Sequence, residues 1–185
     1  GPSVNESAEY ITRDLNTGRF DIFCGGITIP SRQTESKRLL KKGSNGIEFF
    51  TSQVLYDATK VKKMLKYYDE LCKENSVLPR RILLSFAPVS SKKNIDFLKW
   101  LGVEIPQETE DRLIKDNAKM ANQSLEIASE ILKDILHNNE KLGISVPIGL
   151  NVEHIMSYNF QSSINMLQEL SRIYREFCIK TSLYD

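Results

Sequence analysis

Apolar and polar positions follow two different periods along this chain, and the two periods alternate. Short runs of β-branched and aromatic residues indicate buried strands at 20–29, 47–54, 81–87 and 144–150. Apolar residues recurring every three or four positions predict helices at 4–15, 32–42, 57–74, 90–100 and 158–179, and one or two helices over 113–142. Asp57 is the expected N-cap of the helix at 57–74, and Gly43 and Gly143 are the expected stops of two others.

This alternation predicts a parallel sheet, and the continuously apolar strands predict that both of its faces are covered. Two architectures compete, an open doubly wound sheet and part of a (βα)8 barrel. The first usually carries a GxGxxG or Walker loop after its first strand, and the chain has neither. Barrels repeat polar residues at the carboxyl ends of their strands, as here with Arg32, Gln53, Ser90, Asn151 and Glu153. Because a barrel needs eight strands, four predict about half of one.

Gln53 is the most informative of these polar residues. It interrupts an apolar run near the expected end of the second strand. Ligands of parallel α/β proteins bind at the carboxyl ends of the strands, and a buried amide needs hydrogen-bond partners. Gln53 is therefore a site candidate, although it could instead bond a neighbouring loop.

Composition excludes several classes of function. A length of 185 residues fits one domain or part of a larger one, and a net charge of +1 gives no drive toward nucleic acid or anionic membranes. No signal peptide and no apolar run of about 20 residues is apparent. The three cysteines, Cys24, Cys72 and Cys178, lack CxxC spacing and indicate neither a disulfide framework nor a metal site. We therefore expect a cytoplasmic protein.

Four blocks of the sequence carry a family resemblance: GGITIPSR, ESKRLLKKGSNGIEFFTSQVLYD, LLSFAPVSSKKNIDFLKWLGVEIP and IGLNVEHI. Together they resemble the second half of the methylenetetrahydrofolate reductases, and in particular a branch with IPxR and FFxxQVxYD segments. The resemblance implies a flavin-dependent TIM (βα)8 barrel to which residues 1–185, as a single domain, contribute the last four βα units. It also implies reduction of 5,10-methylenetetrahydrofolate to 5-methyltetrahydrofolate, with FAD and NAD(P)H. The family's general-acid glutamate lies in the first half, so no catalytic residue is expected in this chain.

The resemblance also assigns roles to individual residues. Gln53 matches a glutamine that contacts the pterin, and an amide can both donate to and accept from a pterin edge. Phe97, Leu150 and Asn151 are expected to bind substrate beside it, although Phe97 fits a core position equally well.

A second set of residues is implied to bind FAD. Glu35 matches a carboxylate that bonds the adenosine ribose, and Lys42 matches a lysine near the phosphates. Arg38 lies on the same helix face, and Arg32 could also serve the phosphates. A solvated charged helix face is the alternative interpretation of residues 37–42.

The chain departs from the family pattern at two places. Residues 25–32 lack an aromatic residue and a histidine that help to hold the flavin, and Val152 stands where the pattern has an arginine facing the folate. The neighbouring His154 is expected to face solvent rather than to work with Glu153. Two other hypotheses remain open: a half-barrel assembly module that pairs with an N-terminal half-barrel or a second copy, because it would expose two strand edges, and a folate-linked methyltransferase barrel.

Overall fold

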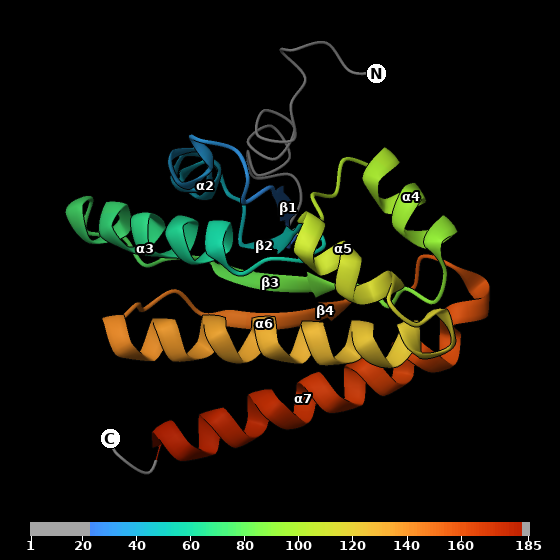
Figure 1. Ribbon diagram of the computed structural model, residues 1–185. Coiled ribbons are helices and arrows are strands. Elements are labelled where there is room, and N and C mark those ends of the chain that lie inside the picture. Colours follow the sequence, from blue (N-terminus) through green and yellow to red (C-terminus); the bar gives the residue numbers. More distant parts are fainter. Residues whose placement is uncertain (1–22, 183–185) are drawn as a thin grey trace.

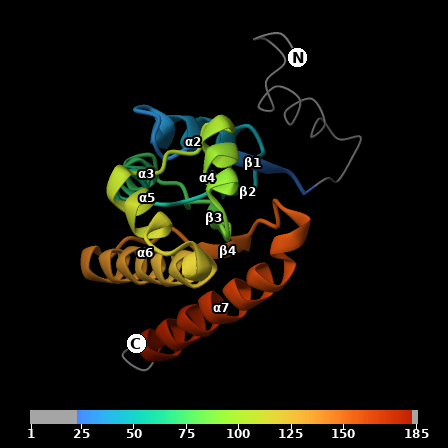
Figure 2. The ribbon, with the colours of Figure 1, turned by 45° about the vertical axis from the view of Figure 1, so that its right-hand side comes forward.

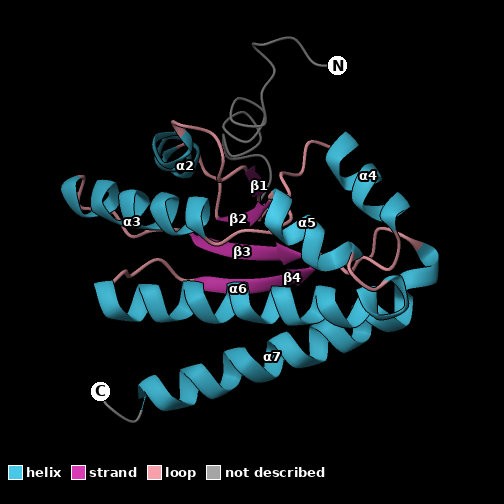
Figure 3. Ribbon diagram, in the orientation of Figure 1, coloured by secondary structure: helices cyan, strands magenta, loops and turns pink. Residues whose placement is uncertain are grey.

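The computed structural model describes residues 23–182, and the helix expected at 4–15 lies outside this range. One parallel sheet contains β1 (Gly25–Thr28), β2 (Phe49–Ser52), β3 (Arg81–Phe86) and β4 (Ile148–Val152). The helices are α2 (Glu35–Ser44), α3 (Thr59–Glu74), α4 (Lys92–Trp100), α5 (Gln107–Ile114), α6 (Met120–Leu142) and α7 (Phe160–Ser182). Two short 3₁₀ turns, η1 (Asn117–Lys119) and η2 (Ser157–Asn159), precede α6 and α7. Figure 3 shows the strands and the helices that lie beside them.

The strands lie in the order of the chain, β1-β2-β3-β4, and each pairs with the next in parallel. The connecting helices follow the same order, since α2 packs on α3, α3 on α6, and α6 on α7. Right-handed connections between sequential parallel strands place every helix on the same face of a sheet. A doubly wound sheet reverses its strand order, so that alternative is wrong for residues 23–182. Figures 1 and 2 show α6 and α7 together at one end of the helix layer and α2 at the other.

The two faces of the sheet differ sharply in exposure. On the helix-covered face, the side chains of Phe50, Ile82 and Leu84 are 0% exposed. The opposite face, which we call the open face, carries Thr51 and Leu83, both half-buried, and Ile27, which is 67% exposed. The prediction of a sheet covered on both faces is therefore wrong for the described residues, because only one face meets helices.

The open face alternates large and small residues on neighbouring strands. A Cβ placed on Gly25 would lie 2.5 Å from the Phe49 ring, and one on Gly149 would lie 2.5 Å from Cδ2 of Leu83. Each large side chain thus leans over the glycine of the adjacent strand. Such interlocking of inward-facing residues is typical of barrel interiors.

The edge of the sheet at the amino ends of the strands is fixed by a buried carboxylate. Asp69, on α3, accepts hydrogen bonds from the backbone nitrogen and hydroxyl of Ser145, at 2.9 and 2.6 Å, and pairs with Lys73 at 2.5 Å. Burial alone would raise the pKa of Asp69, but these hydrogen bonds outweigh it and lower the pKa below its usual value. Asp69 therefore ties α3 to the loop before β4.

Several boundaries differ from the sequence predictions. β4 begins only after Pro147, because Ser145 is bonded to Asp69 and a proline has no N–H for a ladder. Asp57 does not cap α3; the N-cap is Ala58, and the Asp57 carboxylate accepts from the Thr59 hydroxyl instead. Helix α5 occupies residues 107–114, most of which the sequence predictions leave unassigned, whereas the strands, α4 and the Gly143 stop are confirmed apart from shifts at their ends.

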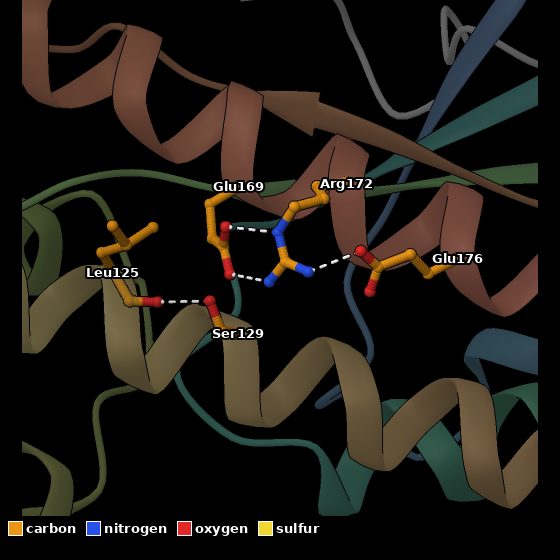
Figure 4. A network of polar contacts seen from close by, with 5 residues as sticks. All are labelled: Leu125, Ser129, Glu169, Arg172 and Glu176. Carbon is orange, nitrogen blue, oxygen red and sulfur yellow. Dashed lines mark hydrogen bonds and ion pairs between the residues drawn. The ribbon is translucent and has the colours of Figure 1, made fainter.

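The outer surface of α6 and α7 is strongly charged. Arg172 donates to Glu169 and to Glu176, each at a shortest distance of 2.6 Å, along the surface of α7, while the Ser129 hydroxyl on α6 bonds back to the Leu125 carbonyl (Figure 4). These contacts lie within each helix, so the surface stabilises its own helices locally. Within residues 23–182, no helix combines the length and hydrophobicity needed to cross a membrane.

Candidate functional site

Polar side chains gather on the open face where the strands reach their carboxyl ends. Ser85 on β3 pairs in register with Asn151 on β4. Gln53 comes directly after β2, and Ser85 lies two residues beyond the Thr51–Leu83 pair. The ladder is irregular at this point, because the backbone nitrogen of Leu55, rather than that of Val54, donates to the Ser85 carbonyl at 2.9 Å. Gln53, Ser85 and Asn151 therefore lie together at the carboxyl edge of three neighbouring strands. We call this set the polar row. With strands about 4.8 Å apart, it spans about 10 Å.

The hydrogen bonds determine how the two amides of the polar row are turned. Asn151 directs its Nδ2 at the Ser85 hydroxyl (3.0 Å) and at the carboxylate of Glu153 (3.4 Å). A carboxylate only accepts, so the Asn151 nitrogen must face it. Oε1 of Gln53 accepts from the backbone nitrogen of Val54 at 3.3 Å, and the Nε2 of Gln53 has no hydrogen-bond acceptor among residues 23–182.

Glu153 extends the polar row at its β4 end. Its backbone nitrogen donates to the Phe86 carbonyl at 2.8 Å, which continues the β3–β4 ladder beyond Val152. Strand alternation places Glu153 on the same face as Asn151. The adjacent His154 is exposed and lies against Phe160, with the ring centroids 5.4 Å apart and the rings tilted by 54°, and it forms no ion pair with Glu153 among the described residues. The expectation for His154 is confirmed.

A pocket of about 470 Å³ opens beside Gln53, between the loops that follow β1 and β2 and the connector from α4 to α5. Its floor is apolar, with Leu55, Val61 and Val103 all buried. Lys60 and Glu104 form an ion pair at its lining, and the hydrogen bond from Lys60 lowers the pKa of Glu104. The pocket can therefore hold a group that has both apolar and polar parts.

Tyr56 connects this pocket to the polar row. Its hydroxyl donates to the carbonyl of Ala87 at 2.8 Å, and its ring is buried. Burial is the main cause of a strongly raised pKa for Tyr56, and the nearby negative charge of Glu153 adds to it. Tyr56 is therefore a neutral, fixed wall between the two parts of the site.

Two of the expected substrate-binding residues lie away from the polar row. Leu150 pairs with Leu84 on the helix-covered face and packs against the core, so it does not share a face with Gln53 and Asn151. Phe97, on α4, stacks on Trp100 with ring centroids 5.8 Å apart and is not part of the pocket lining. The structure thus brings together Gln53 and Asn151 and leaves Leu150 and Phe97 apart.

Glu35 is buried at the start of α2, with its side chain 1% exposed. Its Oε1 accepts from the backbone nitrogen of Ile29 at 3.1 Å, while Oε2 has no hydrogen-bond donor among the described residues. Arg32 and Arg38 approach Oε2 to 4.0 and 3.7 Å, and both guanidinium groups are about half exposed. Glu35 therefore orients two accessible arginines, while its own oxygens are shielded from an incoming group.

Lys42, near the end of α2, turns toward β1 rather than toward solvent. Its ammonium group donates to the carbonyl of Ile27 at 2.7 Å and lies 6.0 Å above the centre of the Phe50 ring. The carbonyl of Thr28 accepts from the backbone nitrogen of Gln53, directly after β2, so the Ile27 carbonyl points to the outer edge of β1. Lys42 and Glu35 together satisfy backbone groups on that edge.

Position 152, where the family pattern has an arginine, faces the core. Val152 pairs with Phe86 and packs against buried residues. The charged residue that reaches the open face after β4 is therefore Glu153. Ser85 was not identified from the sequence; the signal was a single hydroxyl interrupting the apolar run RILLSFA at the period of the open face.

Comparison with known proteins identifies a family and solved structures with a similar fold. A family model described as methylenetetrahydrofolate reductase matches residues 21–170. No curated protein matches the chain. A solved structure titled as an uncharacterized protein from Clostridium thermocellum that binds two copies of 5-methyl-5,6,7,8-tetrahydrofolic acid is similar, with a TM-score of 0.72 and 24% sequence identity. The similarity covers 90% of this chain but 57% of that protein, and it establishes a shared fold.

Proposed function

Because this chain belongs to the methylenetetrahydrofolate reductase family, we propose that it supplies the last four βα units of a TIM (βα)8 barrel that binds a reduced folate at the polar row. The complete protein would reduce 5,10-methylenetetrahydrofolate to 5-methyltetrahydrofolate with NAD(P)H. The general acid would come from the other half of the barrel, since residues 23–182 contribute the binding side of the site. Four more βα units would cover the open face and pair with the outer edge of β4 and with the part of the β1 edge that Lys42 and Glu35 do not occupy.

The observation that carries the folate assignment is the polar row at the carboxyl edge. Among residues 23–182, the Nε2 donors of Gln53 and the Oδ1 acceptor of Asn151 are not used in hydrogen bonds, so both are available to a ligand. A pterin carries donors and acceptors side by side on one edge, so it needs a site that offers both without a large net charge. Ligands of barrel enzymes bind at this edge of the sheet.

The proposed cofactor is FAD, and the residues around α2 fit it in part. The half-exposed guanidinium groups of Arg32 and Arg38, held by the buried Glu35, suit a diphosphate. Glu35 is less suited to the ribose, because its Oε1 is bonded to Ile29 and its Oε2 is shielded. Lys42 is committed to the Ile27 carbonyl, so Arg32 and Arg38 are the better candidates. When bound, FAD would supply the hydride chemistry, while this chain would bind and orient the substrate.

The proposal is tested by purifying the full-length natural protein and recording its absorbance, then assaying NAD(P)H oxidation with 5,10-methylenetetrahydrofolate. Bound flavin together with folate-dependent oxidation would support it. Folate binding without flavin, and without oxidation of NAD(P)H, would instead favour the folate-linked methyltransferase. If neither folate nor flavin bound, the chain would be better explained as an assembly module.

A further inference from the structure

The polar row has a direction, with donors at its β2 end and acceptors at its β4 end. Oε1 of Gln53 is used by Val54, so the group it presents is Nε2, which meets no acceptor among residues 23–182. Both printed hydrogen bonds of Asn151 use Nδ2, so the group it presents is Oδ1. A ligand lying along the row therefore meets donors over β2 and acceptors over β4.

Glu153 makes the β4 end strongly accepting. Its half-buried carboxylate bonds the Asn151 amide at 3.4 Å, and within the described part of the chain no lysine or arginine forms an ion pair with it. Tyr56 cannot neutralise it, because the Tyr56 hydroxyl donates to Ala87. A half-buried carboxylate without a cation is costly unless a donor meets it. The polar row supplies only one such donor, so the other hydrogen-bond-accepting positions of the Glu153 carboxylate are available to a ligand.

Two adjacent N–H groups are the best match to a carboxylate, since they form the paired hydrogen bonds seen between arginine and carboxylates. A pterin offers this pattern at its 2-amino group and N3–H, with the 4-oxo group next to them. The corresponding flavin edge carries a carbonyl at position 2, which a carboxylate would repel. The chemistry of the β4 end therefore favours a pterin over the flavin ring.

The geometry points to Glu153 as a specificity-determining residue that selects the 2-amino-4-oxopyrimidine edge of the folate, with the 2-amino group over β4 and the 4-oxo group toward Gln53. This inference rests on the proposed folate site. The charged group that faces the ligand after β4 is then the carboxylate of Glu153, because Val152 faces the core. Asn151 would hold the Glu153 carboxylate in position through its Nδ2.

The test measures the affinity of the full-length natural protein for 5-methyltetrahydrofolate and for its 2-desamino analogue by isothermal titration calorimetry. The wild-type protein should bind the analogue about 10- to 100-fold more weakly, as expected for loss of a charge-assisted hydrogen bond. Glu153→Gln should weaken the binding of 5-methyltetrahydrofolate by a similar factor and leave the affinity for the analogue nearly unchanged. Glu126→Gln, an exposed position on α6, is the matched control and should change neither affinity.

If Glu153→Gln weakens the binding of both ligands equally, or if the wild-type protein does not prefer the amino compound, the role of Glu153 is overturned. The proposed folate site is not affected by either result. A wild-type protein that binds neither compound would overturn the folate site itself. If Glu153→Gln lowers the folded fraction in a thermal scan, Glu153→Asp provides the same comparison. Glu153→Asp keeps the charge but withdraws it by one methylene, and it should reduce the preference for the amino compound.

Discussion

The ammonium group of Lys42 donates a hydrogen bond of 2.7 Å to the carbonyl of Ile27. At the start of α2, seven positions before Lys42, Glu35 accepts from the next outward-facing backbone group of the same edge, the nitrogen of Ile29. An unpaired edge of a sheet invites pairing with other chains, and proteins protect it with charged side chains. Helix α2 therefore satisfies part of the outer edge of β1 in addition to packing beside it.

This contact predicts that Lys42→Met lowers the free energy of unfolding by about 1 kcal/mol, since an exposed carbonyl loses a charged donor. Urea unfolding of the purified protein measures the change. Lys37→Met, at an exposed position of the same helix, is the control and should have little effect. Equal stability of the Lys42→Met variant and the control would show that the contact does not stabilise β1.

Replacing either of two glycines by alanine should change the free energy of unfolding, but in opposite directions at the two positions. Gly143 ends α6 with a φ of +59°, so Gly143→Ala should cost about 1 kcal/mol although its Cβ would meet no atom within 4 Å. Gly43 lies within α2, where a Cβ would make an ordinary contact 3.4 Å from Cγ of Arg80. Gly43→Ala should therefore gain up to about 1 kcal/mol. Thermal unfolding of both variants checks the pair, and changes of the same sign would contradict it.

Asp69 should make stability depend on pH. Its pKa is lowered in the folded protein, so its contribution is fully present above the unfolded pKa of about 3.9 and is lost as pH falls through the folded value. The free energy of unfolding, measured by urea at about pH 7 and about pH 3, should fall further in the wild-type protein than in Asp69→Asn. Parallel losses in the two proteins would contradict a lowered pKa at Asp69.

The open face should be covered in the natural protein if the chain is half of a barrel. Ile27 is 67% exposed in residues 23–182, and Trp100, on α4, is 78% exposed. In the full-length protein, a thiol reagent should label Ile27→Cys at least about tenfold more slowly than Trp100→Cys, because only the first would be enclosed. Equal labelling, after subtraction of the wild-type cysteines, would mean that nothing covers the open face.

The sequence was sufficient for the order of strands and helices, because each strand is a short apolar run bounded by a Gly, Pro or polar residue. It failed where a tertiary contact decides the boundary. The segment before Ile148 is apolar enough for a strand, but Ser145 is bonded to Asp69, which is distant in sequence. Helix α5 was missed although Pro106 and two glutamates in its first turn are helix-start signals.

The site was predicted less completely than the fold. Gln53 and Asn151 were found because polar residues ending strands are visible in a sequence, and the sheet brings both to its carboxyl edge. Leu150 was assigned to the site without knowing the bounds of β4, which determine the face on which each residue lies. The engagement of Lys42 with Ile27 depends on a partner 15 residues away and has no sequence signature.

The most direct test of the central claim is equilibrium binding of 5-methyltetrahydrofolate to the full-length protein and to Gln53→Ala. Gln168→Ala, at an exposed position of α7, serves as the control. We predict that the wild-type protein and Gln168→Ala bind alike, and that Gln53→Ala binds at least about tenfold more weakly, because its Nε2 donors are lost. Equal binding by all three proteins, or none by the wild-type protein, would contradict a folate site at Gln53.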